Sequence, residues 1–257
     1  MKTYIVPTDF SDLAAQAFDY AAQLARSVGG VVMPVHSYHV PSTAESFSTS
    51  LLEMMQKNAE DQMDAFMSKM DPGVPCHSKV TSMPLRMEIK SILKHHPEAV
   101  VVLATHGEMD WWDHFVGTQS SSLVNVLKTP VLVLHPNEQS KVVVPKKVLF
   151  ATDGKELTEE VIEKWNDICN EYNLEAEAVQ IVDSPSEEGK GTWNGIPVYK
   201  VYHENLERGL QEAMKTLNPD WLVAVHRSQN LWNQLWHKSL TKALALRFSS
   251  PLLVFHE

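Results

Sequence analysis

The 257-residue chain has few features of disulfide-bonded, zinc-binding or nucleic-acid-binding proteins. Its only cysteines, Cys76 and Cys169, are far apart and match neither a CxxC redox pair nor a zinc-ligand spacing. The formal net charge is -10 and the Lys and Arg residues are thinly spread, so no basic stripe can neutralise a nucleic-acid backbone. We therefore expect reduced thiols and no nucleic-acid partner.

Long apolar runs are also missing. No window approaches the run of about 18 apolar residues that a membrane helix requires, so we expect no membrane span. The first residues, MKTYIVPTDF, contain a short apolar run but not the longer stretch of a secretion signal. These absences predict a cytoplasmic protein. The length allows two domains, each large enough to bury a core.

Three segments of the chain occur twice, in the same order. YIVPTDFSD at 4–12 is echoed by VLFATDGKE at 148–156, VVVLATHG at 100–107 by WLVAVHRS at 221–228, and KTPVLVLH at 128–135 by SSPLLVFH at 249–256. Asp9 and Asp153 are 144 positions apart, whereas Pro130 and Pro251 are 121 apart, so the second copy is 23 residues shorter in its middle. The repeat predicts domains at 1–136 and 147–257, joined by a linker at 137–146.

Alternating strand and helix patterns predict the fold class. Four continuous apolar runs are typical of strands buried on both faces of a parallel sheet: 4–6, 31–35, 100–104 and 131–134. Helical periodicity falls between them, in a helix that Ser11 caps and that ends near Gly29, and at 51–70, 85–94 and 120–127. At 51–70 the helical period is carried by a stripe that favours a core-facing role: Leu51, Met55, Met63, Phe66 and Met70. We predict two tandem open parallel sheets with helices on both faces, and a Ser-, Gly- and Glu-rich mobile loop at 184–195.

Candidate ligand-binding residues follow two strands of the first copy. Gly107 and Gly117 flank a loop of nine residues, and glycines allow the backbone to approach a ligand closely. Free N–H groups at the start of the next helix can bind phosphate oxygens, and the hydroxyls of Thr118 and Ser120 add donors. The first strand brings Asp9 to the same edge of the sheet, where its carboxylate can accept from a ribose hydroxyl or bind Mg²⁺.

Taken jointly and in order, these segments resemble the universal stress protein family. The resemblance is carried by Pro7-Thr8-Asp9-Phe10-Ser11, by His36 at the end of the second strand, and by the pattern Gly-x-x-Gly, nine residues, Gly-Ser/Thr. Ala104, Gly107, Gly117 and Thr118 occupy that pattern. The resemblance implies a Rossmann-like, adenine nucleotide alpha hydrolase-like fold and, in the nucleotide-binding branch of the family, a site for ATP.

The resemblance also implies residue roles. Pro7, Thr8 and Asp9 would line the adenosine side, and Ser37 would meet the base through its backbone. The phosphates would be held by Gly107, Gly117, Thr118, Gln119 and Ser120. Asp9 is the candidate ligand of a Mg²⁺ ion bound with the nucleotide. Ala104 replaces the first glycine of the pattern, and its methyl group would crowd the nucleoside if the backbone there needs a positive φ or a close contact.

The second copy has lost this loop. Val225, Ser228 and Lys238 stand at the three glycine positions, followed by Ser239. Asp153 survives, and a cap of the following helix is the favoured role for it. Lys238 could restore an anion site through its charge, but a solvated lysine is the more usual outcome. We therefore expect one nucleotide site per chain. Of the twelve histidines, the closest pair, His36 and His39, is better explained by structural roles than by zinc.

Two functions lead, ahead of a third in which the chain is a nucleotide hydrolase that uses Asp9 with Mg²⁺. One is a stress-response or signalling protein whose first copy binds ATP or a related adenine nucleotide and whose second copy serves association. The alternative is a tandem stress protein without nucleotide, acting by dimerisation or through another small ligand. The last strand of each copy would pair in an internal pseudo-dimer, and a homodimer is possible. No Walker, GxSxG or Ser-His-Asp pattern occurs, so no catalytic residue is assigned and slow ATP hydrolysis is the most we expect.

Overall fold

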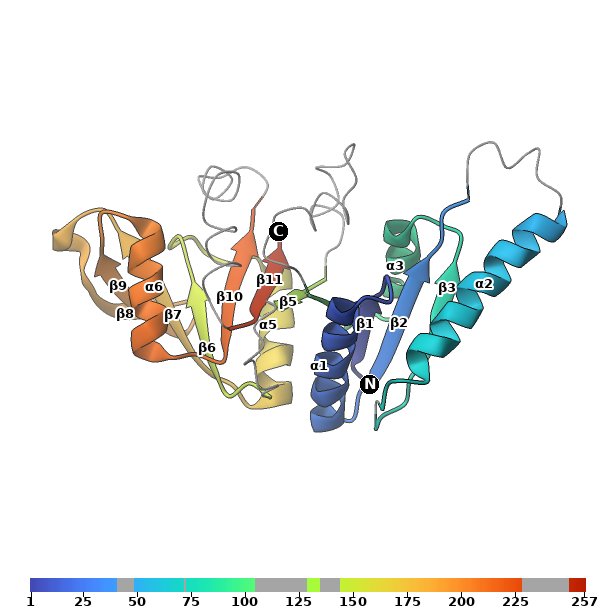
Figure 1. The fold of residues 1–257 in the computed structure, drawn as a ribbon. Coiled ribbons are helices and arrows are strands. Elements are labelled where there is room, and N and C mark those ends of the chain that lie inside the picture. The colour runs from blue at the N-terminus through green and yellow to red at the C-terminus, as the bar shows by residue number, and fades with distance from the viewer. Residues whose placement is uncertain (41–48, 72, 105–128, 135–143, 228–249) are drawn as a thin grey trace. The chain divides into compact units, whose positions relative to one another are not determined.

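The computed structural model describes residues 1–40, 49–71, 73–104, 129–134, 144–227 and 250–257 (Figure 1). The chain divides into two compact units, Met1–Ala104 and Thr105–Glu257. The division precedes the expected linker at 137–146, because strand β5 (Val131–Leu134) pairs with a strand of the second unit. The domain boundaries read from the repeat stay a prediction.

The first unit contains a parallel sheet in the order β3-β2-β1-β4. The strands are β1 (Thr3–Pro7), β2 (Val31–Ser37), β3 (Lys79–Thr81) and β4 (Val100–Ala104). The connecting helices are α1 (Asp12–Val28), α2 (Thr49–Met67) and α3 (Leu85–Leu93). Right-handed crossovers place α1 and α2 on one face and α3 on the other, since the strand order reverses after β3. All strand carboxyl ends therefore meet at one edge.

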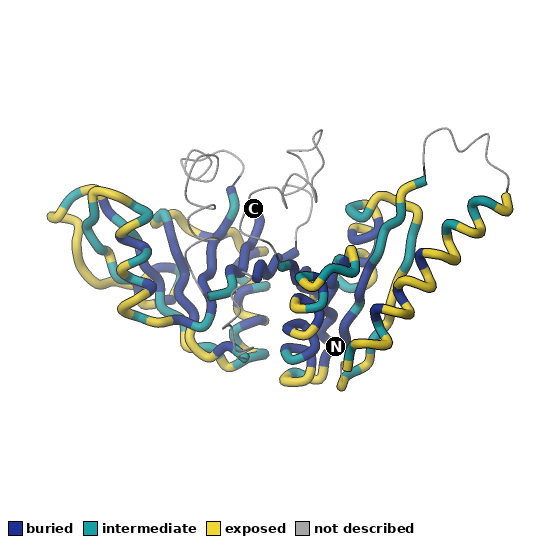
Figure 2. Tube along the Cα trace, in the orientation of Figure 1, coloured by how far each residue is buried: buried dark blue, intermediate teal, exposed yellow. Residues whose placement is uncertain are grey.

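Helix α1 has the start and the end that its sequence predicts. The Ser11 side chain accepts from the Ala14 N–H at 3.2 Å, which satisfies one of the free donors of the first turn. Gly29 ends the helix with φ 67°, a left-handed conformation that glycine adopts without a steric penalty. The stripe expected on helix α2 is the less exposed side of the helix: Met63 and Phe66 are buried and Leu51 and Met55 are half-buried, whereas Met54, which is outside the stripe, is 54% exposed. The rest of α2 is largely exposed (Figure 2).

The second unit contains a larger sheet in the order β5-β11-β10-β6-β7-β9-β8. Its further strands are β6 (Lys147–Ala151), β7 (Glu175–Val182), β8 (Gly189–Trp193), β9 (Ile196–Tyr202), β10 (Trp221–His226) and β11 (Leu252–His256). Pairing is parallel except between β5 and β11 and between β8 and β9. Helices α5 (Glu159–Tyr172) and α6 (Leu206–Leu217) lie on opposite faces (Figure 1). Both units therefore have the doubly wound, Rossmann-like architecture.

Residues 184–195 are not the mobile loop that we predicted. They form a short 3-10 turn (η2, Pro185–Glu187) and strand β8, which pairs antiparallel with β9. Asn194 and Gly195, at φ 47° and 79°, make the two-residue connection of this hairpin. Two successive positive φ angles in an Asn-Gly pair indicate a type I′ turn, whose twist matches that of the strands. This turn signal outweighs the polar composition of the segment.

The last strand of each copy contributes to the same sheet. β5 and β11 run antiparallel, with Leu252 opposite Val133, Leu253 opposite Leu132 and Val254 opposite Val131. All six side chains are buried. The strand pairing that the sequence analysis expected is therefore present within the second unit. None of the described helices is both long and apolar enough to cross a bilayer.

Candidate functional site

A tight turn after β1 presents the first group of candidate residues. The buried Thr8 donates its N–H to the Val35 carbonyl of β2 at 2.9 Å, so the end of β1 is fixed to its neighbour. Thr8 Oγ1 accepts from the Phe10 N–H at 2.9 Å, and Asp9 Oδ1 accepts from the Ser11 N–H at 3.0 Å. Each polar side chain of the turn therefore satisfies a backbone donor two residues ahead.

Asp9 is the exposed charge of this turn. Partial burial raises the pKa of its carboxyl, but the hydrogen bonds from Ser11 and the charge of the nearby His36 outweigh this effect and leave the pKa below its ordinary value. Asp9 is thus an anion at neutral pH. Among the described residues, no Lys or Arg forms an ion pair with it. Such a carboxylate can accept from hydroxyl groups or bind a hard cation.

Pro7, Ser37 and Ala104 lie at the same edge of the sheet. They are the last residues of β1, β2 and β4, and all three are half-buried. Ser37 Oγ donates to the Met83 carbonyl at 2.7 Å, which ties the end of β2 to the segment after β3. Ala104 does not have a positive φ, so its backbone conformation does not require glycine. Of the two ways in which Ala104 could obstruct a ligand, only crowding by its methyl group is left.

The candidate phosphate-binding residues lie outside the described residues. They are Gly107, Gly117, Thr118, Gln119 and Ser120. Of the predicted site, the structure therefore brings together Pro7, Thr8, Asp9, Ser37 and Ala104, because the parallel strands that they end share one edge.

The same turn recurs after β6 in the second unit. Thr152 donates its N–H to the Val179 carbonyl at 3.0 Å and accepts from the Gly154 N–H at 3.0 Å. Asp153 Oδ1 accepts from the Lys155 N–H at 3.1 Å. These bonds match those of Thr8 and Asp9 one for one, so the two turns share the same hydrogen-bond pattern.

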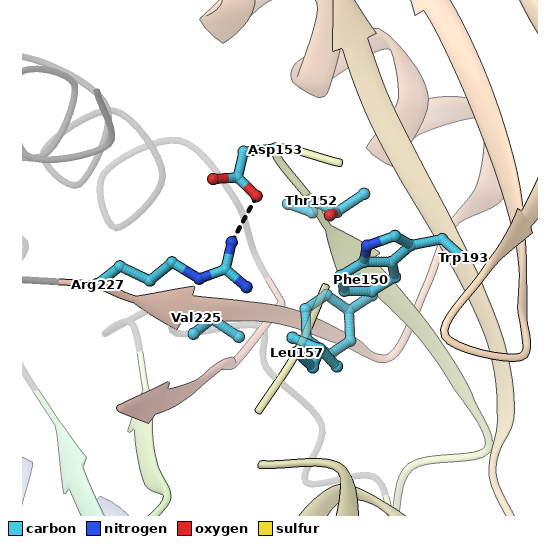
Figure 3. A pocket seen from close by; sticks show the side chains of 8 residues that line it. Phe150, Thr152, Asp153, Leu157, Trp193, Val225 and Arg227 are labelled. Atoms are coloured by element: carbon cyan, nitrogen blue, oxygen red, sulfur yellow. Dashed lines mark hydrogen bonds and ion pairs between the residues drawn. The ribbon is translucent and has the colours of Figure 1, made fainter. Parts of the chain in front are cut away.

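Arg227 distinguishes the second site (Figure 3). It follows β10 directly, is about 10% exposed, and donates from Nη1 to Asp153 Oδ1 at 2.7 Å. Its Nε donates to Glu257 Oε2, and Nη2 donates to the Glu156 carbonyl at 2.7 Å. Burial alone would lower the pKa of the guanidinium, but Glu257 and Asp153 outweigh this effect and raise it. The surviving aspartate of the second copy is therefore neutralised from within the chain.

The pocket beside Arg227 is small. Its cavity volume is about 10 Å³, which is roughly the space for one water molecule, whereas ligand pockets have volumes of several hundred Å³. Aromatic and aliphatic side chains fill most of the space (Figure 3). The lining residues are Phe150, Ala151, Thr152, Asp153, Leu157, Trp193, Val225 and Arg227. Of the positions compared with the glycine pattern, Val225 lines this pocket, and Ser228, Lys238 and Ser239 lie outside the described residues.

The sequence analysis overlooked Arg227, although the repeat contained a signal. With the offset of 121, Arg227 corresponds to His106, so a longer and permanently charged side chain stands directly before a lost glycine. Its partners Asp153 and Glu257 are 74 and 30 residues away. Only the fold brings these three charges together.

His36 has a structural contact in the first unit. Its Nδ1 donates to the Thr8 carbonyl at 2.8 Å, and its ring lies against Phe10. Within the described part of the chain, no group of three or more His, Cys, Asp or Glu side chains is arranged to hold a metal ion. The thiols of Cys76 and Cys169 are free, and burial raises their pKa values to about 11 and about 12, so both are protonated at neutral pH.

Comparison with known proteins identifies the family. The sequence profile of the Universal stress protein family matches residues 1–135. The chain belongs to the universal stress protein family. Comparison with curated protein sequences found no match. As in other members, its fold is Rossmann-like and of the adenine nucleotide alpha hydrolase-like type.

Solved structures are similar over nearly the whole chain. A universal stress protein from Archaeoglobus fulgidus DSM 4304 has 13% identity and a TM-score of 0.67, with 99% of this chain and 96% of that chain covered. A functionally unknown protein from Pseudomonas aeruginosa PAO1 has 10% identity and a TM-score of 0.51, with 99% and 92% covered. These similarities show a shared fold. A universal stress protein solved in complex with cAMP covers 53% of this chain and 98% of its own, with 20% identity and a TM-score of 0.34.

Proposed function

We propose that the first copy binds ATP or a related adenine nucleotide in a stress-response or signalling role, and that the second copy serves association. The observation that carries the proposal is the contrast between the two aspartates. Asp9 and Asp153 end equivalent strands in equivalent turns, but only Asp153 has an arginine bound to it among the described residues. Within the described residues, Asp9 thus keeps an oxygen available for an external partner, whereas Arg227 occupies Asp153.

The charge of Asp9 limits how a nucleotide can lie. A carboxylate repels phosphate groups at short range, so Asp9 fits a ribose hydroxyl or a Mg²⁺ ion beside the phosphates. Pro7 and Thr8 then flank the adenosine, and Ser37 faces the base through its backbone. The phosphates then bind to the backbone N–H groups of the predicted loop and to the donors of the helix start, as the family pattern implies. These residues are Gly107, Gly117, Thr118, Gln119 and Ser120. Bound Mg²⁺ would offset phosphate charge next to Asp9.

The site supports binding rather than turnover. Asp9 is the only described candidate residue that is an anion, and its Oδ1 already accepts from Ser11. Among the described residues, no group of three or more His, Cys, Asp or Glu side chains gathers around it. Nucleotide occupancy would then act by changing a conformation or a partner surface, with hydrolysis slow at most.

Isothermal titration of the full-length protein with ATP and Mg²⁺ tests the proposal. We expect saturable heat at one site per chain, and loss of that heat in Gly117→Trp, whose side chain would block the predicted phosphate loop. Asp9→Asn should weaken binding by about 10-fold, the loss of one charged hydrogen bond or metal contact. Asp153→Asn is the matched control and should leave the affinity unchanged. Absence of heat from the unmodified protein would sink the proposal.

The pairing of β5 with β11 favours the second candidate, a tandem protein that acts by association without nucleotide. Six buried aliphatic residues join the last strands of the two copies, which requires no ligand. Mass spectrometry after denaturation separates the candidates. A purified protein that carries no nucleotide and gives no heat with ATP, ADP or cAMP would favour association alone.

A further inference from the structure

Phe10 has an unusual backbone conformation at the centre of the Asp9 turn. Its φ is 67°, in the left-handed region that bulky residues rarely occupy. It stands between Asp9 and Ser11, whose side chain and N–H form the hydrogen bond of the turn. The orientation of the Asp9 carboxylate therefore depends on whether residue 10 keeps this conformation. Something outside the turn has to stabilise it.

The ring of Phe10 supplies that stabilisation. It lies 4.3 Å from the His36 ring of β2 and 5.7 Å from the Phe66 ring of α2, measured between centroids. His36 is itself bonded to the Thr8 carbonyl, and Phe66 packs edge-on against Phe18 of α1. The ring is thus held between a strand and a helix that are both anchored to the unit.

The second unit lacks this arrangement. Gly154 takes the place of Phe10 at φ 83°, and glycine adopts this conformation without a supporting side chain. Gln180 takes the place of His36 and fills the space, since a Cβ on Gly154 would lie 2.6 Å from Gln180 Nε2. In chain order, η2 and strand β8 follow β7 where α2 follows β2 in the first unit (Figure 1). Trp193 of β8 donates from Nε1 to the Lys155 carbonyl at 2.9 Å, so an aromatic residue supports this turn through a hydrogen bond to its backbone and not by stacking on the side chain of residue 154.

We propose that Phe10 is a positioning residue: its ring, held by His36 and Phe66, keeps the turn in the conformation that presents Asp9 to the ligand. The ligand in question is the nucleotide of the proposed function, on which this inference rests. It follows that α2 is linked to the site, because movement of Phe66 releases Phe10. Nucleotide binding and the position of α2 then influence each other.

Two measurements on the full-length protein test the inference. Hydrogen exchange of the Ser11 amide, followed by NMR, reports the turn without any ligand, and titration with ATP and Mg²⁺ reports binding. Phe10→Gly keeps access to the left-handed region but removes the ring. We expect about 10-fold faster Ser11 exchange and about 3- to 10-fold weaker binding, because a smaller fraction of molecules is competent to bind. Phe66→Ala, which leaves the turn sequence intact, should shift both in the same direction.

Two further variants separate positioning from stability. Phe10→Tyr keeps the ring and should retain wild-type exchange and affinity within about 2-fold. Ile89→Ala removes a buried side chain of α3, on the other face of the sheet from Phe66, and should lower the melting temperature without affecting Ser11 exchange. The inference is overturned if Phe10→Gly leaves Ser11 exchange unchanged, or if Ile89→Ala accelerates it equally. If the wild-type protein binds no ATP, the proposed function fails, while the exchange data still decide whether Phe10 positions the turn.

Discussion

Arg227 bridges two carboxylates of the second unit, Asp153 and Glu257. It neutralises Asp153 and Glu257, which are 16% and 13% exposed. Removing one member of such a buried group leaves the others uncompensated. We expect Arg227→Ala to lower the free energy of unfolding by about 3 kcal/mol, with Arg227→Lys recovering part of it. Urea denaturation followed by tryptophan fluorescence measures the change, since Trp165, Trp193 and Trp221 are buried in this unit.

A second cation near Asp153 provides the control. Lys155 Nζ lies 3.9 Å from Asp153 Oδ2 and is 52% exposed, so Lys155→Ala should change stability by less than about 0.5 kcal/mol. Equal losses from the two variants would contradict the assignment of Arg227 as the buried partner of both carboxylates.

His256 predicts a pH dependence of the same unit. Burial, helped by the charges of His226 and Lys164, lowers the pKa of His256 to about 3 from an ordinary 6.5. The unfolded chain therefore binds a proton below pH 6.5 that the folded chain does not. Stability from this residue is complete above pH 6.5 and falls as the pH drops toward 3. The slope is about 1.4 kcal/mol per pH unit.

Replacement of the imidazole isolates this contribution. His256→Gln should make the unfolding free energy less dependent on pH between 6.5 and 5, a difference of about 2 kcal/mol over that interval. His39→Gln, at an exposed position, should leave the profile unchanged. Urea denaturation at several pH values gives both slopes, and parallel profiles for wild type and His256→Gln would refute the prediction.

The hydrogen bonds of some single residues could be predicted from the sequence, whereas the contacts of others could not. Ser11, Thr8 and Asp9 could be placed because their hydrogen bonds span only two or three residues. Arg227 and Phe10 could not, because their roles depend on residues from other elements: Glu257 for the arginine, and Phe66 for the aromatic ring. Short sequence patterns predict hydrogen bonds between residues that are near neighbours in the chain. Contacts between residues of different elements can be identified only from the fold.

At the scale of elements, the β8–β9 hairpin offers a test of backbone conformation. Gly195 has φ 79° and open space around its missing Cβ, so substitution there changes only the backbone energy. We expect Gly195→Ala to destabilise the second unit by about 1 kcal/mol. Gly191→Ala in β8 is the matched control, because its Cβ would meet Val198 Cγ1 at an ordinary 3.7 Å and its φ is not positive. The control should be neutral or slightly stabilising in urea denaturation. A larger loss at Gly191 than at Gly195 would contradict the turn assignment.

Some strands could be predicted from their own residues, whereas others could not. Strands β1, β2, β4 and β5 are buried on both faces, so their continuous apolar runs were sufficient to predict them. β8 is mostly exposed and contains two glycines, so its composition favoured a loop. Only the Asn-Gly pair at 194–195 pointed to a hairpin, and it was overlooked. β3 has three residues, too few for a periodic pattern.

At the scale of the whole molecule, the two units have corresponding strand orders, β3-β2-β1-β4 and β9-β7-β6-β10, and differ at the carboxyl ends of those strands. Unit one follows β2 with helix α2 and leaves Asp9 exposed, whereas unit two replaces that helix with a hairpin and closes Asp153 with Arg227. The copies share the last-strand pairing of β5 with β11.

This asymmetry predicts that nucleotide stabilises the molecule unevenly. A ligand that binds only the folded first copy adds RT ln(1 + [L]/Kd), or about 2.7 kcal/mol at 100 times Kd, to the stability of that copy. Hydrogen exchange followed by mass spectrometry, with saturating ATP and Mg²⁺, should therefore slow exchange in peptides covering 3–11. Peptides covering 147–155, the equivalent segment, should exchange at the same rate with and without ATP, and Asp9→Asn should reduce the protection of 3–11. Equal protection of both segments would mean that the second site also binds nucleotide, despite Arg227.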